Sequence, residues 1–288
     1  MAKIKIATDS TSDIPVKIRE ELGIEVLPIT IIDGEKEYKD GYDMTPQEFY
    51  KILEEADEIP STSRVVPVLY GELYEEAYKE EYTDVILVSI NSKGSSTMQG
   101  AIMAKDMFYE DYPDAKDKIN IHIIDSKTYS MAYGMPVIRA AQMVKEGATV
   151  EEILSEINDW LENVGVLFVP LNLKFVKKSG RVSAAAAFVG DALGLKPIIT
   201  FEDGDSKVLN KIRGDKKAIS TMVDMAASER AEGTPYSLVY GTNLEAFEKL
   251  KAVCGEKLDI PATYEYEVGA VISINAGPDV VGIIYRKK

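Results

Sequence analysis

Side chains that could bind an anion gather in three short segments of the chain. They are Asp9-Ser10-Thr11-Ser12-Asp13, Ser61-Thr62-Ser63, and the run from Ser92 to Thr97. Each segment follows a predicted strand or precedes a predicted helix. The first turn of a helix presents free N–H groups and the positive end of the helix dipole, so these segments together could hold a carboxylate or a phosphate. Ser, Thr and Asp are also the usual helix caps, so capping explains each segment equally well when it is taken alone.

Arg181 is the candidate for a charged partner of such an anion. It closes a basic run that begins at Lys174, in a chain whose formal net charge is −15. A guanidinium group pairs well with a carboxylate or a phosphate. The alternative is a solvated basic face beside a turn. The small residues that follow, 184–193, predict a helix that either lets an apolar ligand approach closely or packs tightly on a sheet.

Several kinds of chemistry find no support in the sequence. The chain has one histidine, His122, and one cysteine, Cys254, so a zinc site with the usual ligands and a Cys-His dyad are not expected. His122 lies in an apolar strand and is predicted to be packed or capped, and Cys254 is predicted to be structural. No Walker A sequence, Gly-x-Gly-x-x-Gly or Gly-x-Ser-x-Gly is present.

The acidic balance of the chain argues against nucleic acid as a partner, because phosphates require a positive surface. No stretch of about 18 apolar residues occurs, so no stable membrane insertion is expected. The segment KIKIA near the start predicts a strand rather than a signal peptide. We therefore expect a cytoplasmic protein.

The elements that must position these residues predict an α/β protein of two domains. In residues 1–162, predicted strands near 3–7, 24–32, 84–90 and 119–125 alternate with helices, which is typical of a parallel sheet with right-handed crossovers. Residues 163–288 predict a mixed α/β domain, with neighbouring strands in 196–202 and 206–214 and a final pair of strands in 264–269 and 270–287. No flexible linker separates the two, so we expect them to pack closely around a ligand cleft.

Seven short motifs, taken in order, resemble those of the DegV family. No single motif is specific, but seven in the same order along the whole chain are. Asp9 to Asp13 resembles the amino-terminal motif of that family, and Asn275 stands where its carboxyl-terminal motif has histidine. The matching segments are 9–13, 61–63, 94–99, 125–126, 180–183, 196–199 and 275–278.

This resemblance implies a protein that encloses a long-chain fatty acid such as palmitate, stearate or oleate. The acyl chain would lie in an apolar tunnel lined by the helix 184–193. The family's Thr-Ser segment and its serine loop hold the carboxylate, which carries over to Thr62 and Ser95 in this sequence. The ligand-binding set that the resemblance implies contains no catalytic residue, no metal and no other cofactor. Its members are Thr62, Ser63, Ser95, Ser96, Arg181 and Asn275.

Two alternatives remain open at this point. Some members of the family present the fatty acid to a separate kinase, and there the arginine and the histidine matter for phosphorylation. Asn275 cannot carry a proton or a positive charge, which counts against a kinase partner but not against binding. The second alternative is an enzyme acting on a small anion, with Asp9 as nucleophile or base beside Ser10 and Ser12.

Overall fold

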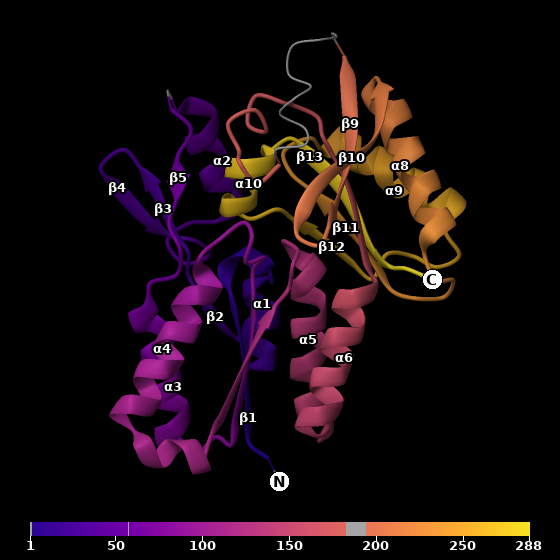
Figure 1. Ribbon diagram of the computed structural model, residues 1–288. Helices are drawn as coiled ribbons and strands as arrows, with labels where there is room; N and C mark the ends of the chain where they lie inside the picture. Colours follow the sequence, from indigo (N-terminus) through magenta and orange to yellow (C-terminus); the bar gives the residue numbers. More distant parts are fainter. Residues whose placement is uncertain (1, 57, 183–193) are drawn as a thin grey trace. The chain divides into compact units, whose positions relative to one another are not determined.

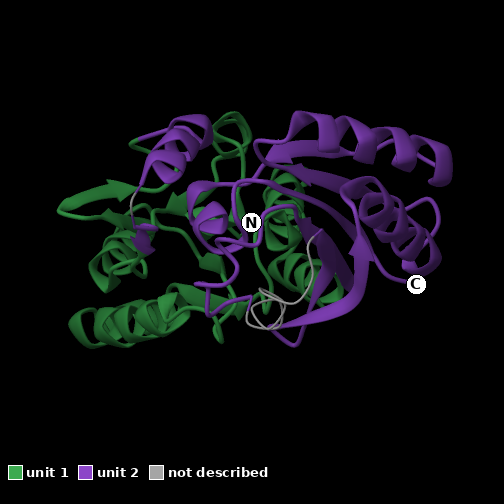
Figure 2. Ribbon diagram, turned by 90° about the horizontal axis from the view of Figure 1, so that it is seen from above, with its two compact units in different colours: residues 1–43, 62–162 green, residues 44–61, 163–288 purple. Residues whose placement is uncertain are grey.

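The computed structural model describes residues 2–56, 58–182 and 194–288. The chain forms two compact units, shown in green and purple in Figure 2. Unit 1 comprises residues 1–43 and 62–162, and unit 2 comprises residues 44–61 and 163–288. The helix predicted at 184–193 lies outside the described residues.

Unit 1 is built on the parallel sheet that the alternation of strands and helices predicts. Its strand order is β2-β1-β6-β7, and every neighbouring pair is parallel. The central strand β6 is buried at every position, as expected of a strand covered on both faces. Helices α3 and α4 lie on one side of the sheet, and α5 and α6 on the other (Figure 1). The elements are β1 (Ile4–Asp9), α1 (Val16–Leu22), β2 (Glu25–Leu27), α3 (Pro67–Lys79), β6 (Asp84–Ser89), α4 (Thr97–Asp111), β7 (Asn120–Asp125), α5 (Met131–Glu146) and α6 (Val150–Asn163).

The single strand predicted near 24–32 is in fact two strands of different sheets. Pro28 separates them, because proline has no N–H to donate to a neighbouring strand. β2 therefore ends before it, and β3 (Thr30–Asp33) joins a small sheet of order β4-β3-β5. β4 (Lys36–Lys39) pairs with β3 as an antiparallel hairpin whose turn contains Gly34 at φ +60°. β5 is the short strand Ser61–Thr62.

Unit 2 is built on a mixed sheet of order β10-β9-β8-β13-β11-β12. The two neighbouring strands predicted near 196–202 and 206–214 are confirmed as the antiparallel pair β9 and β10. Helices α8 and α9 contribute to one apolar core together with β8, β11 and β13. The elements are β8 (Val164–Pro170), β9 (Leu195–Glu202), β10 (Asp205–Arg213), α8 (Asp215–Glu229), β11 (Tyr236–Tyr240), α9 (Leu244–Lys257), β12 (Tyr264–Glu267), α10 (Ala270–Ala276) and β13 (Val280–Arg286).

The final pair of strands predicted in 264–269 and 270–287 is confirmed as strands, since β12 and β13 lie in these segments, but the two do not pair with each other. β12 pairs in parallel with β11, and residues 270–276 form the buried helix α10 before β13 begins. Gly277, at φ +88°, is the C-cap residue of this helix. Helix α2 (Pro46–Glu55) packs beside α10 within unit 2 (Figure 1). The Tyr50 hydroxyl donates to the Val268 carbonyl at 2.6 Å.

The start of α2 is fixed by two side-chain hydrogen bonds. The Glu48 N–H donates to the Thr45 hydroxyl at 3.3 Å, and the Glu48 carboxylate accepts from the Thr45 N–H at 2.8 Å. This reciprocal pair is a capping box. Across residues 2–56, 58–182 and 194–288, no helix is both long enough and apolar enough to cross a membrane.

A candidate carboxylate site at the edge of the parallel sheet

Ser95 and Ser96 lie in the loop that follows β6, at the carboxyl edge of the parallel sheet, where open α/β sheets bind ligands. Thr62 and Ser63 precede α3, and Ser95 and Ser96 precede α4. Gly100 brings the first turns of these helices together. A Cβ atom on Gly100 would lie 3.5 Å from the Val65 carbonyl oxygen and 3.6 Å from the Pro67 ring. The starts of α3 and α4, which these hydroxyl segments precede, therefore pack closely within unit 1.

Ser95 is a half-buried residue that supports the start of α4. Its hydroxyl accepts from the Thr97 N–H at 3.3 Å and lies 2.8 Å from the Thr97 hydroxyl. When the Thr97 hydroxyl donates, the Ser95 hydrogen can be given to a further acceptor. Ser96 is exposed and makes no side-chain capping bond at the helix start. Ser95 thus combines helix capping with the ability to donate to a carboxylate.

Capping does not explain Thr62 and Ser63. Helix α3 begins at Pro67, and its N-cap residue Val66 makes no side-chain capping bond. The Ser63 N–H donates to the Thr30 carbonyl at 2.8 Å, which continues the pairing of β5 with β3. Thr62 is half-buried and Ser63 is exposed. The helix-capping interpretation therefore leaves the hydroxyl groups of this segment unexplained.

Asp9 has the surroundings of a structural carboxylate. It is wholly buried at the end of β1 and caps the short 3-10 helix Ser10–Ser12. One oxygen accepts from the Thr11 N–H at 3.2 Å and the Tyr133 hydroxyl at 2.7 Å, and the other accepts from the Ile90 N–H at 2.8 Å. Burial raises the pKa of Asp9, and these hydrogen bonds oppose the rise. Such a group is poorly placed for the nucleophile or base of the small-anion alternative.

Three residues at this edge hold strained backbone conformations. Asp13, Lys127 and Ser130 have φ angles of +55°, +53° and +56°. The Ser130 hydroxyl donates to the Asp13 carboxylate, so the loops after β1 and β7 support each other. A non-glycine residue in such a region costs on the order of 1–3 kcal/mol, and such strain is concentrated at functional sites.

The loop that carries Ser95 is also held from its β7 side. The Asp125 carboxylate accepts from the Ser92 N–H at 3.0 Å and from the Ser92 hydroxyl. The Asn91 amide donates to the Tyr129 hydroxyl at 2.8 Å. A Cβ atom on Gly94 would lie 2.1 Å from that same hydroxyl, so glycine allows Tyr129 to rest on the loop. Sequence reasoning missed Tyr129 and Tyr133, whose only signal was their spacing of four residues at the start of a helix.

Arg181 and Asn275, the candidates of unit 2, are connected through Ser179. The Ser179 hydroxyl donates to the Asn275 side-chain oxygen at 3.0 Å and accepts from the Arg181 N–H at 3.1 Å. The Asn275 amide nitrogen donates to the Val271 carbonyl at 2.9 Å. The structure therefore brings these two residues into one network, in which both ends of the Asn275 amide are engaged.

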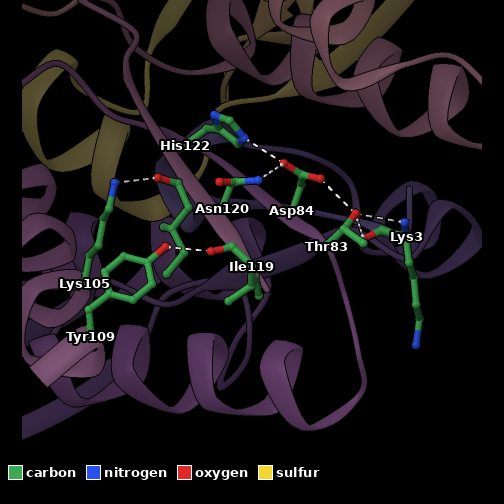
Figure 3. A network of polar contacts seen from close by, with 9 residues as sticks. Lys3, Thr83, Asp84, Lys105, Tyr109, Ile119, Asn120 and His122 are labelled. Carbon is green, nitrogen blue, oxygen red and sulfur yellow. Dashed lines mark hydrogen bonds and ion pairs between the residues drawn. The ribbon is translucent and has the colours of Figure 1, made fainter. Parts of the chain in front are cut away.

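The single histidine lies at the opposite edge of the parallel sheet. His122 Nε2 lies 2.9 Å from the Asp84 carboxylate, which also accepts from Asn120 and from the Thr83 hydroxyl (Figure 3). The prediction of a packed or capped histidine is confirmed. Cys254 is buried, and burial raises its pKa to about 12, which fits a structural thiol. Among the described residues, no group of three or more His, Cys, Asp or Glu side chains could hold a metal ion.

Comparison with known proteins identifies the family. The model of the DegV family, which is described as a family of uncharacterised proteins, matches residues 3–288. A DegV domain-containing protein of Caldanaerobacter subterraneus is 37% identical over 295 residues and is covered completely, as is this chain. A DegV domain-containing protein of Clostridium perfringens is 32% identical over 287 residues, covering 99% of each chain.

Solved structures agree with this match over the full length. A fatty-acid-binding DegV family protein of Thermus thermophilus has a TM-score of 0.87 at 29% identity, covering 99% of this chain and 100% of that one. DegV of Bacillus subtilis, described as a fatty acid binding protein, has a TM-score of 0.83 at 28% identity, with 100% of both chains covered. A stearic acid-binding protein of Eubacterium ventriosum has a TM-score of 0.86 at 26% identity, covering 100% of this chain and 99% of that one. The chain therefore belongs to the DegV family.

Proposed function

We propose that this protein binds a long-chain fatty acid and that Thr62 and Ser95 hold the carboxylate. One observation carries the proposal: the whole chain shares its fold, at 26–29% identity, with DegV proteins that are described as binding fatty acids. The geometry of unit 1 supports it, since Gly100 lets the starts of α3 and α4 pack closely, and Thr62 and Ser95 precede these two helices.

The proposed head-group site follows from the chemistry of a carboxylate. A charge removed from water needs hydrogen-bond donors around it. Ser95 can donate its hydroxyl hydrogen, and the first turn of α4 adds the positive end of a helix of 15 residues. Thr62 is half-buried, and Ser63 and Ser96 are exposed. Within unit 2, Arg181 and Asn275 are proposed as further ligand-binding residues, and Ser179 connects them.

The acyl chain would supply most of the affinity. Each buried methylene contributes roughly 0.8 kcal/mol, so about fourteen methylenes would contribute roughly 11 kcal/mol before ordering costs. A hydrogen bond to the carboxylate contributes about 1–3 kcal/mol by comparison. The hydroxyl groups would therefore orient the ligand more than they retain it. Tight binding would need no catalytic step by the chain itself.

The same geometry does not favour the presentation of the ligand to a kinase. The Asn275 amide already donates to the Val271 carbonyl and accepts from Ser179. An amide in that position has no proton to transfer and no positive charge. Binding without phosphorylation is the function that these contacts support best.

Lipid extraction tests the proposal directly. The purified protein is denatured and extracted with organic solvent. Mass spectrometry then identifies and quantifies the extracted lipid relative to the amount of protein. We expect close to one fatty acid per chain, and the mass identifies the preferred length and unsaturation. An empty extract, together with no thermal shift on adding palmitate or oleate, would contradict the proposal.

A further inference from the structure

Two aspartates hold the loop that begins at Ile90 from both sides. β6 lies between β1 and β7 in the parallel sheet, and Asp125, the last residue of β7, pairs in register with Ser89. Asp9, the last residue of β1, accepts from the Ile90 N–H at 2.8 Å. Asp125 accepts from the Ser92 N–H at 3.0 Å. The backbone that leaves β6 is thus hydrogen-bonded to a carboxylate on each neighbouring strand.

The fixed backbone continues directly to Ser95. The Asn91 N–H donates to the Thr128 carbonyl at 3.2 Å. The Asn91 carbonyl in turn accepts from the N–H groups of Gly94 and Ser95, each at 3.1 Å. A shift at Ile90 or Ser92 would therefore move the turn that presents the Ser95 hydroxyl.

We propose that Asp9 and Asp125 are positioning residues that place Ser95 for carboxylate binding. This carboxylate clamp, Asp9 and Asp125, does not touch the ligand and acts through the loop between them. The inference rests on the proposed function, because Ser95 must contribute to affinity for its position to matter. The clamp gives the buried Asp9 a structural role in place of the role of nucleophile or base in a small-anion enzyme.

The two positions differ in the substitution that each can accept. Both Asp9 oxygens accept from backbone N–H groups, those of Thr11 and Ile90. Asparagine has only one acceptor atom, so Asp9→Asn must place an NH₂ group against one of these donors. At Asp125 one oxygen accepts from the N–H groups of Ser92 and Lys127, and the other faces the Ser92 hydroxyl. A hydroxyl can accept as well as donate, so Asp125→Asn should be tolerated while Asp125→Ala should not.

Asp84 provides a matched control. It is a carboxylate of similar burial on β6 itself, and its partners Thr83, Asn120 and His122 lie at the far edge of the sheet (Figure 3). Asp84→Asn should lower stability without moving the Ser95 loop. Thr62→Val is a second control, because Thr62 lies in β5 and not in the loop that Asp9 and Asp125 hold.

The test is a set of double-mutant cycles on the delipidated full chain, with oleate as the probe at a temperature where every variant is folded. In the wild-type background we expect Ser95→Ala to weaken binding about tenfold. With Asp9→Asn or Asp125→Ala, the further effect of Ser95→Ala should fall below about twofold, while the effect of Thr62→Val persists. With Asp125→Asn or Asp84→Asn, the full effect of Ser95→Ala should remain. A purely structural role would lower the melting temperature and leave the tenfold ratio unchanged.

Hydrogen exchange of the ligand-free protein supplies a readout that does not depend on binding. Protection of the Gly94 and Ser95 amides should fall in Asp9→Asn and Asp125→Ala and stay unchanged in Asp84→Asn. If Asp9→Asn does not fold, the contrast between Asp125→Ala and Asp125→Asn decides the question alone. Failure of the wild-type protein to bind any fatty acid would overturn the proposed function. Binding by the wild type, with the tenfold effect of Ser95→Ala retained in the clamp variants, would overturn the clamp.

Discussion

Ser95 shows how one hydroxyl group can serve the fold and a ligand together. It accepts from the Thr97 N–H at the start of α4, and it retains a hydrogen to donate when the Thr97 hydroxyl donates to it. Thr62 differs, because α3 begins at Pro67 without a side-chain cap. Of these two residues, only Thr62 has no capping role that would explain its presence.

Ser95→Ala is therefore expected to weaken fatty-acid binding by about 1–2 kcal/mol, since one hydrogen bond to a charged group is lost. Isothermal titration of the delipidated protein with oleate measures the change. The matched control is Ser155→Ala, because Ser155 is exposed on α6. Equal affinities in wild type and Ser95→Ala would remove Ser95 from the site.

Gly134 shows how an element can be positioned by the absence of a side chain. It lies in α5, and a Cβ atom there would be 2.5 Å from the Ser12 carbonyl oxygen and 2.7 Å from the Met131 sulfur. The close approach lets α5 lie against the loop after β1, where Tyr133 reaches Asp9. The loops of the candidate site thus depend on how closely this helix can pack.

Gly134→Ala is expected to lower the free energy of unfolding by about 1–3 kcal/mol, because an inserted methyl group forces α5 away from the backbone of Ser12. Chemical denaturation measures the change. Gly71→Ala is the matched control, since Gly71 also lies in a helix but nothing lies within 4 Å of the added atom. The free energy of unfolding of Gly71→Ala should rise by up to about 1 kcal/mol, because alanine has a higher helix propensity than glycine. A Gly134→Ala protein as stable as wild type would show that α5 can shift freely.

The end of α8 is fixed to the loop before β12 by an ion pair with a defined pH dependence. Arg230 is buried, and its guanidinium lies 2.5 Å from the Asp259 carboxylate, which also accepts from the Gly233 N–H. The hydrogen bond from Arg230 lowers the pKa of Asp259 below its usual value of 3.8. A lowered folded-state pKa stabilises the fold above the unfolded value, and this stabilisation is lost as pH falls through the folded value.

Asp259→Asn should therefore remove part of the loss of stability that the wild type shows below about pH 4. Urea denaturation at a series of pH values from neutral to acid measures how steeply the free energy of unfolding falls with pH. Asp114→Asn serves as the comparison, because Asp114 lies on the exposed surface of unit 1 and is another carboxylate whose pKa is lowered. An identical acid slope in wild type and Asp259→Asn would contradict the assignment.

Binding should also be visible in the stability of the whole molecule. A ligand that binds only the folded state, at a free concentration 100 times its Kd, adds about 2.7 kcal/mol. For a chain of 288 residues that corresponds to a rise in Tm of several degrees. Delipidated protein should melt lower, and added oleate should restore the higher Tm. A short-chain acid such as butyrate is the control, because it lacks the apolar surface, and a similar shift with butyrate would argue for a head-group site alone.

The sequence by itself determined the features that rest on local chemistry. Alternating strands and helices predicted the parallel sheet of unit 1. The order of the seven motifs indicated the family before any contact was known. Both signals can be detected in the order of residues along the chain, without knowledge of any tertiary contact.

Only the tertiary structure decided the features that depend on residues far apart in the chain. The segment 270–276 became a helix, and β12 paired with β11 rather than with β13. Asp9 could have been a nucleophile by its type and place in the sequence. Its burial and its bonds to Ile90 and Tyr133, more than 80 residues away, make it a support instead. A residue type states what chemistry is possible, and the surrounding fold decides whether that group is exposed to a ligand or used to hold the loop that meets it.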